Sequence, residues 1–516
     1  MQPDRRHFVF TFLVLLAMIV LTACNPTQGE DIKPTETSLP PTAALEPIPT
    51  SIPLVEANEN PLTGLPVEDK NLLDLPALLV SVSHFPVEAR PQAGLSFAPW
   101  VFEVYITEGA TRFLTVYHGI FPEPEVPVIG DCSVRDEPFV QTSNIIGSRV
   151  WLDDNANNIQ EAWERGVGGV CVYLYQEDGA LLQQTSTDSN GYYAFNVEPG
   201  RYALDFQNPQ WMQFVQKNIG EENRDSDVDP SSGQTDMLDI TTSLHNVDAG
   251  LILTSQPPST SELPPAKVGP VRSGRLIYAD IAAFFPDSCL IYAFASPEVL
   301  ELLPKCYFVY HDLEGGGYML DISELKRLAE ESKLYDIDYA SNSFDNDPVE
   351  GGETASRLDV YIAYLNQSAW VYDAASQSYW RYVDKADYDN AGVVYPDVDR
   401  LTSRQLQFEN VVVIFTEHDV VSPTNLDIHL EEDKEGYALL FRDGQMYDMF
   451  WSTNLSDQER ESGRYKPIKF VNPDTKQLMP LKPGRTWIIV VTPETTVTPQ
   501  GEGEWYLEFY QPAGSK

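Results

Sequence analysis

The sequence predicts a multi-domain protein in which α/β (α+β) regions flank a central all-β sandwich. The chain has 516 residues, and the roughly 450 that follow its first segments suffice for two or three domains of ordinary size. Residues 140–253 show short alternating strands separated by Asp, Asn and Gly turns, a pattern typical of a small sandwich. Helix signals appear only after residue 267. The central segment therefore differs in fold class from its flanks.

The first residues predict export and lipid attachment. Arg5 and Arg6 precede an apolar run that ends in Leu-Thr-Ala-Cys at 21–24. This order is typical of a secretory signal peptide, 1–23, and the last four residues match a lipobox, so Cys24 is expected to carry the lipid. The alternatives are a plain transmembrane anchor and an ordinary cleaved signal, but the run is short for a bilayer span.

Residues 24–59 predict a disordered tether. The segment is rich in Pro, Thr, Ser and Glu and has almost no aromatic residues. Such a composition buries too little apolar surface to offset the entropy lost on ordering. The tether would hold the folded part away from the membrane.

The charge balance excludes one class of partner. The formal net charge is −43, and both nucleic acid and anionic lipid surfaces require a basic patch. We therefore expect no nucleic-acid partner. An acidic excess suits solubility outside the cell or the binding of divalent cations.

The flanks alternate strands with helices. Apolar runs at 77–82, 100–105 and 112–117 predict strands, and Asp443-Gly444 between two further runs predicts a hairpin. Ser296-Pro297 predicts the start of one helix, and the capping-box pattern at 321–324 predicts the start of another.

The most specific motif is a twelve-residue loop from Asp153 to Glu164. Oxygen-bearing side chains occupy its positions 1, 3, 5, 9 and 12, and position 7 supplies a backbone carbonyl, which is the ligand spacing of an EF-hand calcium loop. Asn158 replaces the usual Gly at position 6, and Asn tolerates the left-handed backbone expected there. The predicted ligands are Asp153, Asn155, Asn157, Ile159, Glu161 and Glu164.

Two further polar clusters are candidate calcium ligands. One is a turn, and in the other three carboxylates alternate along the chain, which on an extended segment points them to one face. The alternative is a solvated acidic loop. These candidates are Asp188 and Asn190 in the first, and Asp225, Asp227 and Asp229 in the second. One or more Ca²⁺ ions are thus the expected cofactor.

The central segment resembles the B-type domain of serine-aspartate repeat surface proteins. The resemblance covers about 110 residues, a length usual for one domain, and its motifs occur in the same order as in that domain. It implies an immunoglobulin-like, Cna-B-type sandwich that binds calcium and serves as a rigid spacer or adhesin. The matching segments are 146–151, 153–164, 166–170, 187–193, 199–202, 225–227 and 247–251.

The flanks resemble a second family, the YerB-like bacterial lipoproteins of unassigned function. The matching segments are 60–65, 89–96, 108–113, 268–275 and about 410–491. In that family the strand containing Arg112 runs almost directly into the Gly-Pro-Val-Arg-Ser segment, so the resemblance implies that the central module is an insertion at an exposed loop. The predicted parts are 60–125 and 267–395 (N-terminal domain), 140–253 (insert), 254–266 (linker) and 396–516 (β-rich C-terminal domain).

The body offers a candidate ligand-binding cluster. Guanidinium groups bind carboxylate or phosphate in a bidentate manner, whereas the structural alternative is an Arg–Glu network that joins strands. The candidates are Arg90, Glu103, Glu108, Arg112, Arg272, Ser273 and Arg275, with His84 and His118 nearby as acid–base groups. The sequence contains no catalytic motif that we recognise, so enzyme status is unsupported.

Four cysteines remain after Cys24, namely Cys132, Cys171, Cys289 and Cys306. An exported chain can oxidise them. Cys289 and Cys306 are the pair closest in sequence, and either a disulfide or two separate buried thiols fits.

The preferred interpretation is a non-catalytic lipoprotein of the cell envelope, lipid-anchored to the outer face of the cell membrane and carrying a calcium-stiffened module. Its partners would be the membrane and a cell-wall or surface protein. Two alternatives are a body that modifies an envelope polymer or binds an anion, and an adhesin that acts through the insert.

Overall fold

The computed structural model describes residues 58–255, 262–309, 317–335, 337–464 and 466–515. The expected signal peptide, Cys24 and nearly all of the expected tether lie outside these residues. Within the described part, no helix combines the length and apolarity that crossing a bilayer requires.

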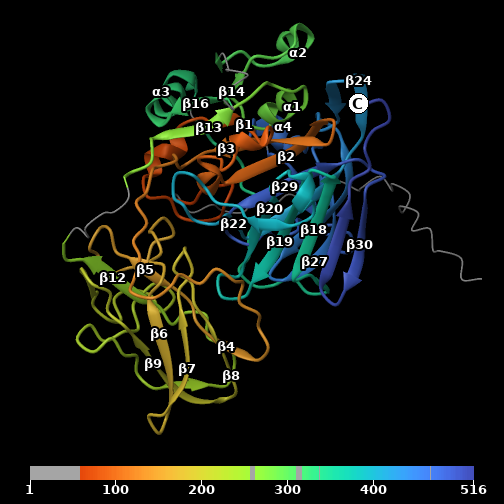
Figure 1. Cartoon of the computed structure of the whole chain (residues 1–516). Coiled ribbons are helices and arrows are strands. Elements are labelled where there is room, and N and C mark those ends of the chain that lie inside the picture. Colours follow the sequence, from red (N-terminus) through yellow and green to blue (C-terminus); the bar gives the residue numbers. More distant parts are fainter. Residues whose placement is uncertain (1–57, 256–261, 310–316, 336, 465, 516) are drawn as a thin grey trace, which may run out of the picture. The chain divides into compact units, whose positions relative to one another are not determined.

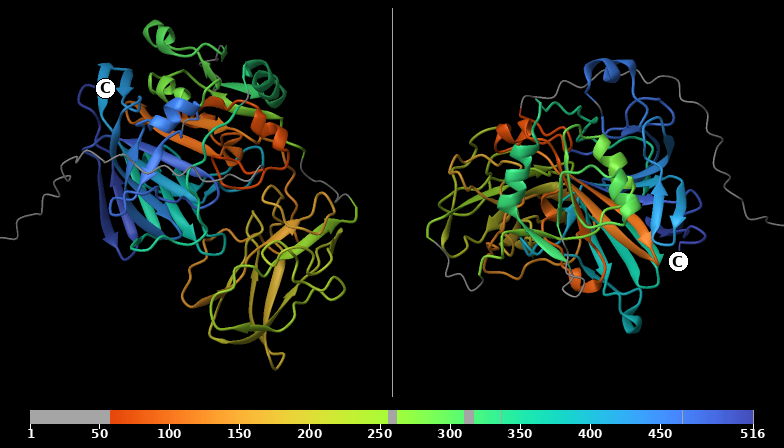
Figure 2. Two further views of the ribbon diagram at one scale, coloured as in Figure 1. Left: turned by 180° about the vertical axis from the view of Figure 1, so that it is seen from behind. Right: turned by 90° about the horizontal axis from the view of Figure 1, so that it is seen from above.

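One large mixed sheet unites strands from both ends of the body (Figures 1 and 2). Within the described residues it has 13 strands in the order β15-β14-β1-β3-β2-β29-β23-β26-β27-β17, with β13 on β1 and β16, and β28 on β27. Strand β2 pairs in parallel with β29, which pairs in parallel with β23, so segments almost 400 residues apart share one sheet. The strands are β1 (Leu78–Ser83), β2 (Trp100–Thr107), β3 (Ala110–Tyr117), β13 (Lys267–Val271), β14 (Cys289–Ala293), β15 (Tyr307–Val309), β16 (Tyr318–Asp321), β17 (Glu353–Thr354), β23 (Asn410–Phe415), β26 (Glu435–Arg442), β27 (Gln445–Ser452), β28 (Lys469–Val471) and β29 (Thr486–Val491).

The sequence of these strands explains their central position. All six residues of β1, β23 and β29 are buried, and they form near-continuous apolar runs, as expected for strands covered on both faces. The predicted hairpin at Asp443-Gly444 joins β26 to β27, and both turn residues have positive φ, 53° and 70°. Asp-Gly suits that backbone because Gly carries no side chain and Asp tolerates the left-handed region.

A second sheet belongs to the C-terminal half. Its order is β21-β20-β19-β18-β31-β30, with β22 on β20, and a separate pair is formed by β24 and β25. The strands are β18 (Arg357–Ala363), β19 (Asn366–Asp373), β20 (Ser378–Asp384), β21 (Val394–Pro396), β22 (Gln407–Phe408), β24 (His418–Ser422), β25 (Asn425–Ile428), β30 (Thr496–Gly501) and β31 (Glu504–Glu508). Its apolar side chains join those of the large sheet in one continuous core that includes Trp100, Trp370 and Trp487.

The described residues contain four α-helices, all short: α1 (Ile277–Ala283), α2 (Pro297–Leu302), α3 (Ile322–Ser332) and α4 (Asp457–Ser462). Short 3-10 turns occupy Lys70–Asp74, Val87–Ala89, Leu95–Phe97 and Tyr388–Asn390. The two helices predicted from Ser296 and from the pattern at 321–324 are present, and α3 buries Leu325 and Leu328 on one face. A multi-domain, mostly β chain is thus confirmed, whereas an α/β body is not, because the helices are too few and too short to cover both faces of the sheets.

The segment between β3 and β13 forms an all-β module, drawn in yellow to green in Figure 1. Its strands form three small sheets, β10-β12-β5, β11-β9-β6-β7 and β4-β8. They are β4 (Asn144–Ile146), β5 (Val150–Leu152), β6 (Cys171–Gln176), β7 (Leu181–Ser186), β8 (Phe195–Val197), β9 (Gly200–Phe206), β10 (Met212–Phe214), β11 (Leu238–Ile240) and β12 (Ala249–Leu253). The module has a core of its own, in which Val150, Leu174, Tyr193, Leu204 and Leu251 are fully buried.

Two disulfides are present among the described residues. Cys289 pairs with Cys306, which decides between the two interpretations left open by the sequence. Cys132 pairs with Cys171 of β6, a link that the sequence did not predict. This second disulfide joins the segment that enters the module to the module's own sheet.

Candidate functional site

The segment from Asp153 to Glu164 forms a closed loop, neither helical nor extended. The carboxylate of Asp153 accepts hydrogen bonds from the backbone N–H groups of Asn157 (3.1 Å) and Asn158 (2.9 Å). At the other end, Glu164 accepts from the backbone N–H groups of Asp154 (3.1 Å) and Glu161 (3.0 Å). The first and last predicted ligands therefore fold back over the same short loop.

The side chains at the middle positions, although exposed, contact Glu161. The Nδ2 atoms of Asn155 and Asn157 donate to the two carboxylate oxygens of Glu161, at 3.3 and 2.7 Å. Asn157 Oδ1 accepts from the backbone N–H of Ile159 at 2.7 Å. Asn158 has a φ of 66°, the left-handed conformation expected at position 6 of such a loop. The loop thus gathers the side chains of positions 1, 3, 5, 9 and 12.

Three carboxylates of this loop are buried. Asp153, Glu161 and Glu164 are 2%, 6% and 3% exposed. Burial is the main cause that raises the pKa of Glu164 to about 8; the backbone N–H of Glu161 opposes this rise, and the carboxylates of Glu161 and Asp153 support it. Like charges brought together out of water disfavour their own ionisation, so the loop holds negative charge at a free-energy cost.

A second acidic group lies beside the loop. The backbone of Arg224 hydrogen-bonds that of Gln160 (2.7 Å), which brings Asp225 and Asp227 next to the loop. Asp225 is 4% exposed, and its Oδ1 has no hydrogen-bond partner in the described part of the chain. Asp227 accepts from the backbone N–H of Asp248 (2.7 Å). Burial, with smaller contributions from the carboxylates of Asp248 and Asp225, raises the pKa of Asp227 to about 7.

Asp248 is a member of this group that the sequence reasoning missed. Its carboxylate accepts from Ser148 Oγ (2.9 Å) and from the backbone N–H of Arg149 (2.8 Å). It is 4% exposed, and burial raises its pKa to about 6. The sequence shows Asp248 only as a single Asp that precedes an apolar strand. Because it is distant from Asp225 along the chain, no local pattern indicates that the two side chains belong to one group.

Asp229, by contrast, turns away from this group. It is exposed, and its carboxylate accepts from the backbone and hydroxyl groups of Ser231 and from the backbone of Ser232. These hydrogen bonds lower its pKa to about 2. Here Asp229 closes a turn.

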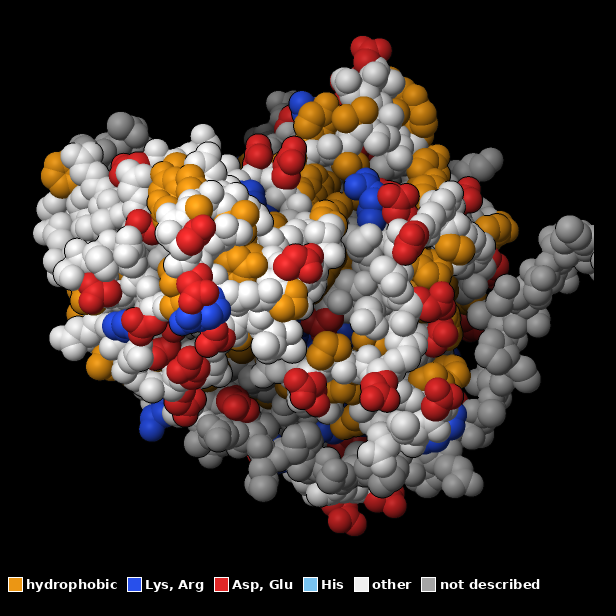
Figure 3. All heavy atoms as spheres, turned by 90° about the horizontal axis from the view of Figure 1, so that it is seen from below, with side chains coloured by type: hydrophobic (Ala, Val, Ile, Leu, Met, Phe, Trp, Pro, Cys, Tyr) orange, Lys and Arg blue, Asp and Glu red, His pale blue; other side chains and the backbone are white. Residues whose placement is uncertain are grey.

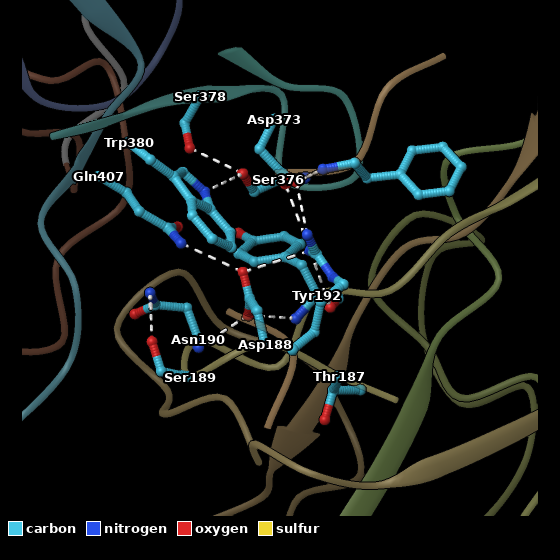
Figure 4. Close-up of polar contacts among 12 residues, drawn as sticks. Thr187, Asp188, Ser189, Asn190, Tyr192, Asp373, Ser376, Ser378, Trp380 and Gln407 are labelled. Carbon is cyan, nitrogen blue, oxygen red and sulfur yellow. Dashed lines mark hydrogen bonds and ion pairs between the residues drawn. The ribbon is translucent and has the colours of Figure 1, made fainter. Parts of the chain in front are cut away.

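Asp188 binds the body (Figure 4). Its Oδ1 accepts from the backbone N–H groups of Asn190 and Tyr192, both at 2.8 Å, which closes the predicted turn. Its Oδ2 accepts from Nε2 of Gln407 on β22 at 3.1 Å and lies 3.5 Å from the guanidinium of Arg135. Asp188 is thus part of a contact between module and body, and Asn190 belongs to the turn that carries it.

Arg135 is the centre of that contact, and no pattern in the sequence predicted this role. Its NH1 lies 2.7 Å from Oδ1 of Asp373 at the end of β19, and its guanidinium stacks on Trp380 at 5.0 Å. A small apolar cluster of Ile145, Ala194, Ala374 and Ala375 accompanies the polar groups. Module and body therefore share a desolvated, charge-paired contact.

As the side chains stand, no three His, Cys, Asp or Glu residues of the described part are arranged as a metal-binding group. The carboxylates of the loop instead hold backbone N–H and amide groups. An amide nitrogen and oxygen are exchanged by a half-turn of the side chain. Turning Asn155 and Asn157 would present oxygen to Glu161 in place of nitrogen, at the cost of the hydrogen bonds that their Oδ1 atoms accept from the backbone N–H groups of Asn157 and Ile159.

In the body, two of the candidate ligand-binding residues belong to structural networks. Arg90 donates to the carbonyl (2.5 Å) and carboxylate (3.3 Å) of Asp384 and to His84. Glu103 is buried and accepts from Thr111 (2.9 Å) and Trp487 (3.1 Å). The contacts of Arg90 and Glu103 are therefore those of a polar network that joins strands, which is the structural alternative to a ligand-binding cluster.

The remaining candidates separate into two groups. Arg112 and Ser273 meet, since Arg112 NH1 donates to the carbonyl (3.0 Å) and Oγ (2.6 Å) of Ser273, and Arg272 and Arg275 lie in the same segment. Glu108 is exposed on the turn between β2 and β3. His118 is buried, and burial lowers its pKa to about 4.

The fold and these sites define a β-rich, multi-domain protein with an all-β module inserted into a larger body. Comparison with family models gives the same division. Residues 62–140 match the N-terminal domain, and residues 359–488 the C-terminal domain, of the protein of unknown function DUF3048. Residues 144–251 match the SdrD B-like domain. The predicted combination of a YerB-like body with an inserted serine-aspartate repeat B-type domain is therefore confirmed.

Similar curated proteins match about a fifth of this chain, and the chain covers only a small part of their length. The chain is 35% identical over 99 residues to serine-aspartate repeat-containing protein C of Staphylococcus aureus (strain MRSA252), covering 19% of this chain and 11% of that protein. It is 37% identical over 95 residues to serine-aspartate repeat-containing protein F of Staphylococcus epidermidis (strain ATCC 12228), covering 18% and 6%. Among solved structures, the YerB protein of Bacillus subtilis aligns at 17% identity and a TM-score of 0.45, covering 84% of this chain and 96% of that one.

Proposed function

We propose that this protein is a non-catalytic lipoprotein of the cell envelope whose inserted module is stiffened by Ca²⁺ and acts as a spacer or binding module at the cell surface. The observation that carries the proposal is the closed loop from Asp153 to Glu164. Its oxygen-bearing residues have the spacing of a calcium loop. Among the described residues, the guanidinium of Arg224, 4.0 Å from Glu161, is the one cationic group paired with its three buried carboxylates.

Calcium would relieve the loop's electrostatic strain. A divalent cation among Asp153, Glu161 and Glu164 offsets their mutual repulsion and supplies a partner for the desolvated oxygens. The group of Asp225, Asp227 and Asp248 is the candidate for a second ion, because Asp225 and Asp248 are buried and the Oδ1 of Asp225 lacks a partner among the described residues. The face shown in Figure 3 carries more acidic than basic side chains, as the net charge of −43 leads one to expect.

Calorimetric titration of calcium into the chain beginning at residue 25 tests the proposal. We expect saturable binding that Asp153→Ala and Glu164→Gln weaken. The matched control is Asp239→Asn, an exposed carboxylate of the same module that lies outside both groups. Absence of binding heat at millimolar calcium would refute the calcium site.

Lipid attachment rests on the sequence at 21–24 alone and needs its own test. Cells fed an alkyne-labelled fatty acid should incorporate the label into the full-length protein, which should fractionate with membranes. The Cys24→Ser variant should lose the label. Labelling that persists in this variant would overturn the proposed anchor without bearing on the calcium loop.

A further inference from the structure

A large cleft is lined by residues of both the inserted module and the body. Its volume is about 1020 Å³, and its lining includes Arg149 and Tyr192 of the module and Arg404, Glu409 and Arg485 of the body. Sites for drug-sized ligands have volumes of about 300–1,000 Å³. The cleft therefore has room for several residues of a peptide.

The turn that joins the module to the body also orients Arg149. Asp188 in this turn accepts from Nε2 of Gln407 on β22 at 3.1 Å (Figure 4). The carbonyl of Asn190, in the same turn, accepts from Nε of Arg149 at 3.4 Å, and the carbonyl of Glu164 accepts from its NH2 at 2.6 Å. Both acceptors are neutral, so they hold the guanidinium of Arg149 in place without neutralising it.

Arg485 belongs to the body and lines the same cleft. Its NH1 donates to the carbonyl of Ser96, and its guanidinium stacks on the ring of Phe408 at 5.2 Å. Its Nε lies 3.9 Å from the carboxylate of Glu409, which is too long for a hydrogen bond. Glu409 therefore only partly neutralises Arg485.

Arg404 is the third arginine of this lining. Its NH2 lies 2.7 Å from the carboxylate of Glu125, whereas its Nε is buried without an acceptor in the described part of the chain. Burial is the main cause that lowers the pKa of Arg404, and the carboxylate of Glu125 opposes this change. The guanidinium groups of Arg485 and Arg149 lower that pKa further, so the three arginines lie within electrostatic reach of one another.

The balance of charge among these groups indicates the charge of a ligand. Three guanidinium groups are accompanied by the carboxylates of Glu125 and Glu409, and the neighbouring Arg165 is already paired with Asp154 at 2.6 Å. One carboxylate would balance the remaining positive charge, whereas a phosphate dianion would leave an excess of negative charge. Arginine binds carboxylates through two parallel N–H donors.

Aromatic side chains supply the other contacts that a peptide needs. Tyr192, Phe97, Phe121 and Trp163 line the cleft, and each is partly exposed. Arginine, tyrosine and tryptophan are the residues that contribute most to binding energy where proteins recognise one another. The lining thus combines cationic groups for a carboxylate with apolar rings for side chains.

We propose that this cleft binds a peptide through one carboxylate, which Arg149, Arg404 and Arg485 hold, while apolar side chains of the peptide lie against the aromatic lining. The carboxylate belongs either to the end of the peptide chain or to an acidic side chain, and both present the same pair of oxygens. The site requires neither calcium in the loop nor a lipid on Cys24.

Selection from synthetic peptide pools tests the proposal. The chain beginning at residue 25 is immobilised and equilibrated, in a buffer with chelator, with three pools of random N-acetylated six-residue peptides. Basic residues are left out of all pools because the net charge of −43 would attract them. The first pool has a free C-terminal carboxylate and no Asp or Glu, the second has a C-terminal amide and contains Asp and Glu, and the third has neither kind of carboxylate.

We expect the first or the second pool to be retained at least about tenfold more than the third, because only they offer a charge-assisted partner to the arginines. Preference for the first pool would identify a chain end as the ligand, and preference for the second an acidic side chain. Because a chelator is present, the outcome does not depend on whether the loop binds calcium.

Variants connect this binding to the cleft. A retained peptide is synthesised again and titrated calorimetrically into Arg485→Gln and Arg149→Gln, each of which should weaken its affinity by at least about tenfold. The matched control is Arg460→Gln on α4, which removes an exposed arginine paired with Glu432 and should leave the affinity unchanged. The Tm of each variant shows whether it is folded.

Two results would overturn the proposal. One is equal retention of all three pools by the native chain, a result that needs no variant to fold. The other is an unchanged affinity in a folded Arg485→Gln protein, since the peptide would then bind elsewhere.

Discussion

The guanidinium of Arg135 lies 2.7 Å from the carboxylate of Asp373, and this pair links the segment entering the inserted module to strand β19 of the body. Both side chains are desolvated, with 12% and 0% exposure. Asp188 of the module lies on the other side of the same guanidinium, at 3.5 Å. One arginine thus neutralises two buried carboxylates, one from each part.

Removing Arg135 should loosen the contact between module and body. In Arg135→Gln, Asp188 and Asp373 remain buried without their cation, and breaking a buried pair in this way costs about 3–5 kcal/mol. We expect faster limited proteolysis in the segments that flank the module. Arg201→Gln, which removes an exposed pair with Glu177, is the control. Identical digestion of the Arg135 variant and the native chain would contradict this role.

Calcium should enlarge the destabilising effect of Glu164→Gln. In a chelator, the variant should be only slightly less stable than the native module, because the removal of one of three buried, mutually repelling carboxylates offsets the loss of one of the two backbone N–H bonds that Glu164 accepts. With calcium at 100 times its Kd, the native chain gains about 2.7 kcal/mol and the variant gains less. Denaturant unfolding followed by tryptophan fluorescence, with and without calcium, measures both values. A variant that responds to calcium as the native chain does would count against the loop.

The disulfide between Cys132 and Cys171 should stabilise the module specifically. Replacing both residues by Ser should lower its free energy of unfolding by about 2–4 kcal/mol. The corresponding double variant of Cys289 and Cys306 is the control, since that pair joins strands β14 and β15 of the body region. Calorimetry should show a lower unfolding temperature for the module in the first double variant and for the body in the second. If both variants lowered the same unfolding transition, the Cys132–Cys171 disulfide would not stabilise the module specifically.

Acid should destabilise the body partly through His118. Burial lowers the pKa of this histidine to about 4, so between pH 6.5 and 4 the unfolded chain binds a proton that the folded chain does not. Stability should therefore fall as pH falls through this interval, by about 2–3 kcal/mol for this residue. Denaturant unfolding of the native chain and of His118→Gln at several pH values measures the difference. The variant should show a shallower decline, and an equally steep one would exclude His118 as a source.

Local patterns in the sequence predicted the elements whose determinants lie close together along the chain. The Asp443-Gly444 hairpin, the helix beginning after Ser296 and the apolar strand of residues 77–82 follow from turn chemistry, capping and burial within a few residues. The spacing of oxygens from Asp153 to Glu164 likewise predicted a loop that folds on itself, and the loop does so.

The body was harder to predict because its sheet is assembled from distant segments. Strand β29 lies between β2 and β23, a pairing that no local pattern encodes. The sequence showed apolar runs and some helical periodicity and so suggested an α/β body. Which faces are covered by helices and which by other strands depends on pairing over hundreds of residues.

By itself, the sequence determined the order of the parts, the all-β character of the insert and the oxygen spacing of its loop, since each depends on neighbours along the chain. Tertiary structure alone decided that Asp188 meets Arg135 and Gln407, that Asp248 joins Asp225 and Asp227, and that Arg112 lies with Ser273 while Arg90 binds Asp384. The physical reason is that strand register and domain contact set which side chains share a desolvated space. Charge interactions are strong only there.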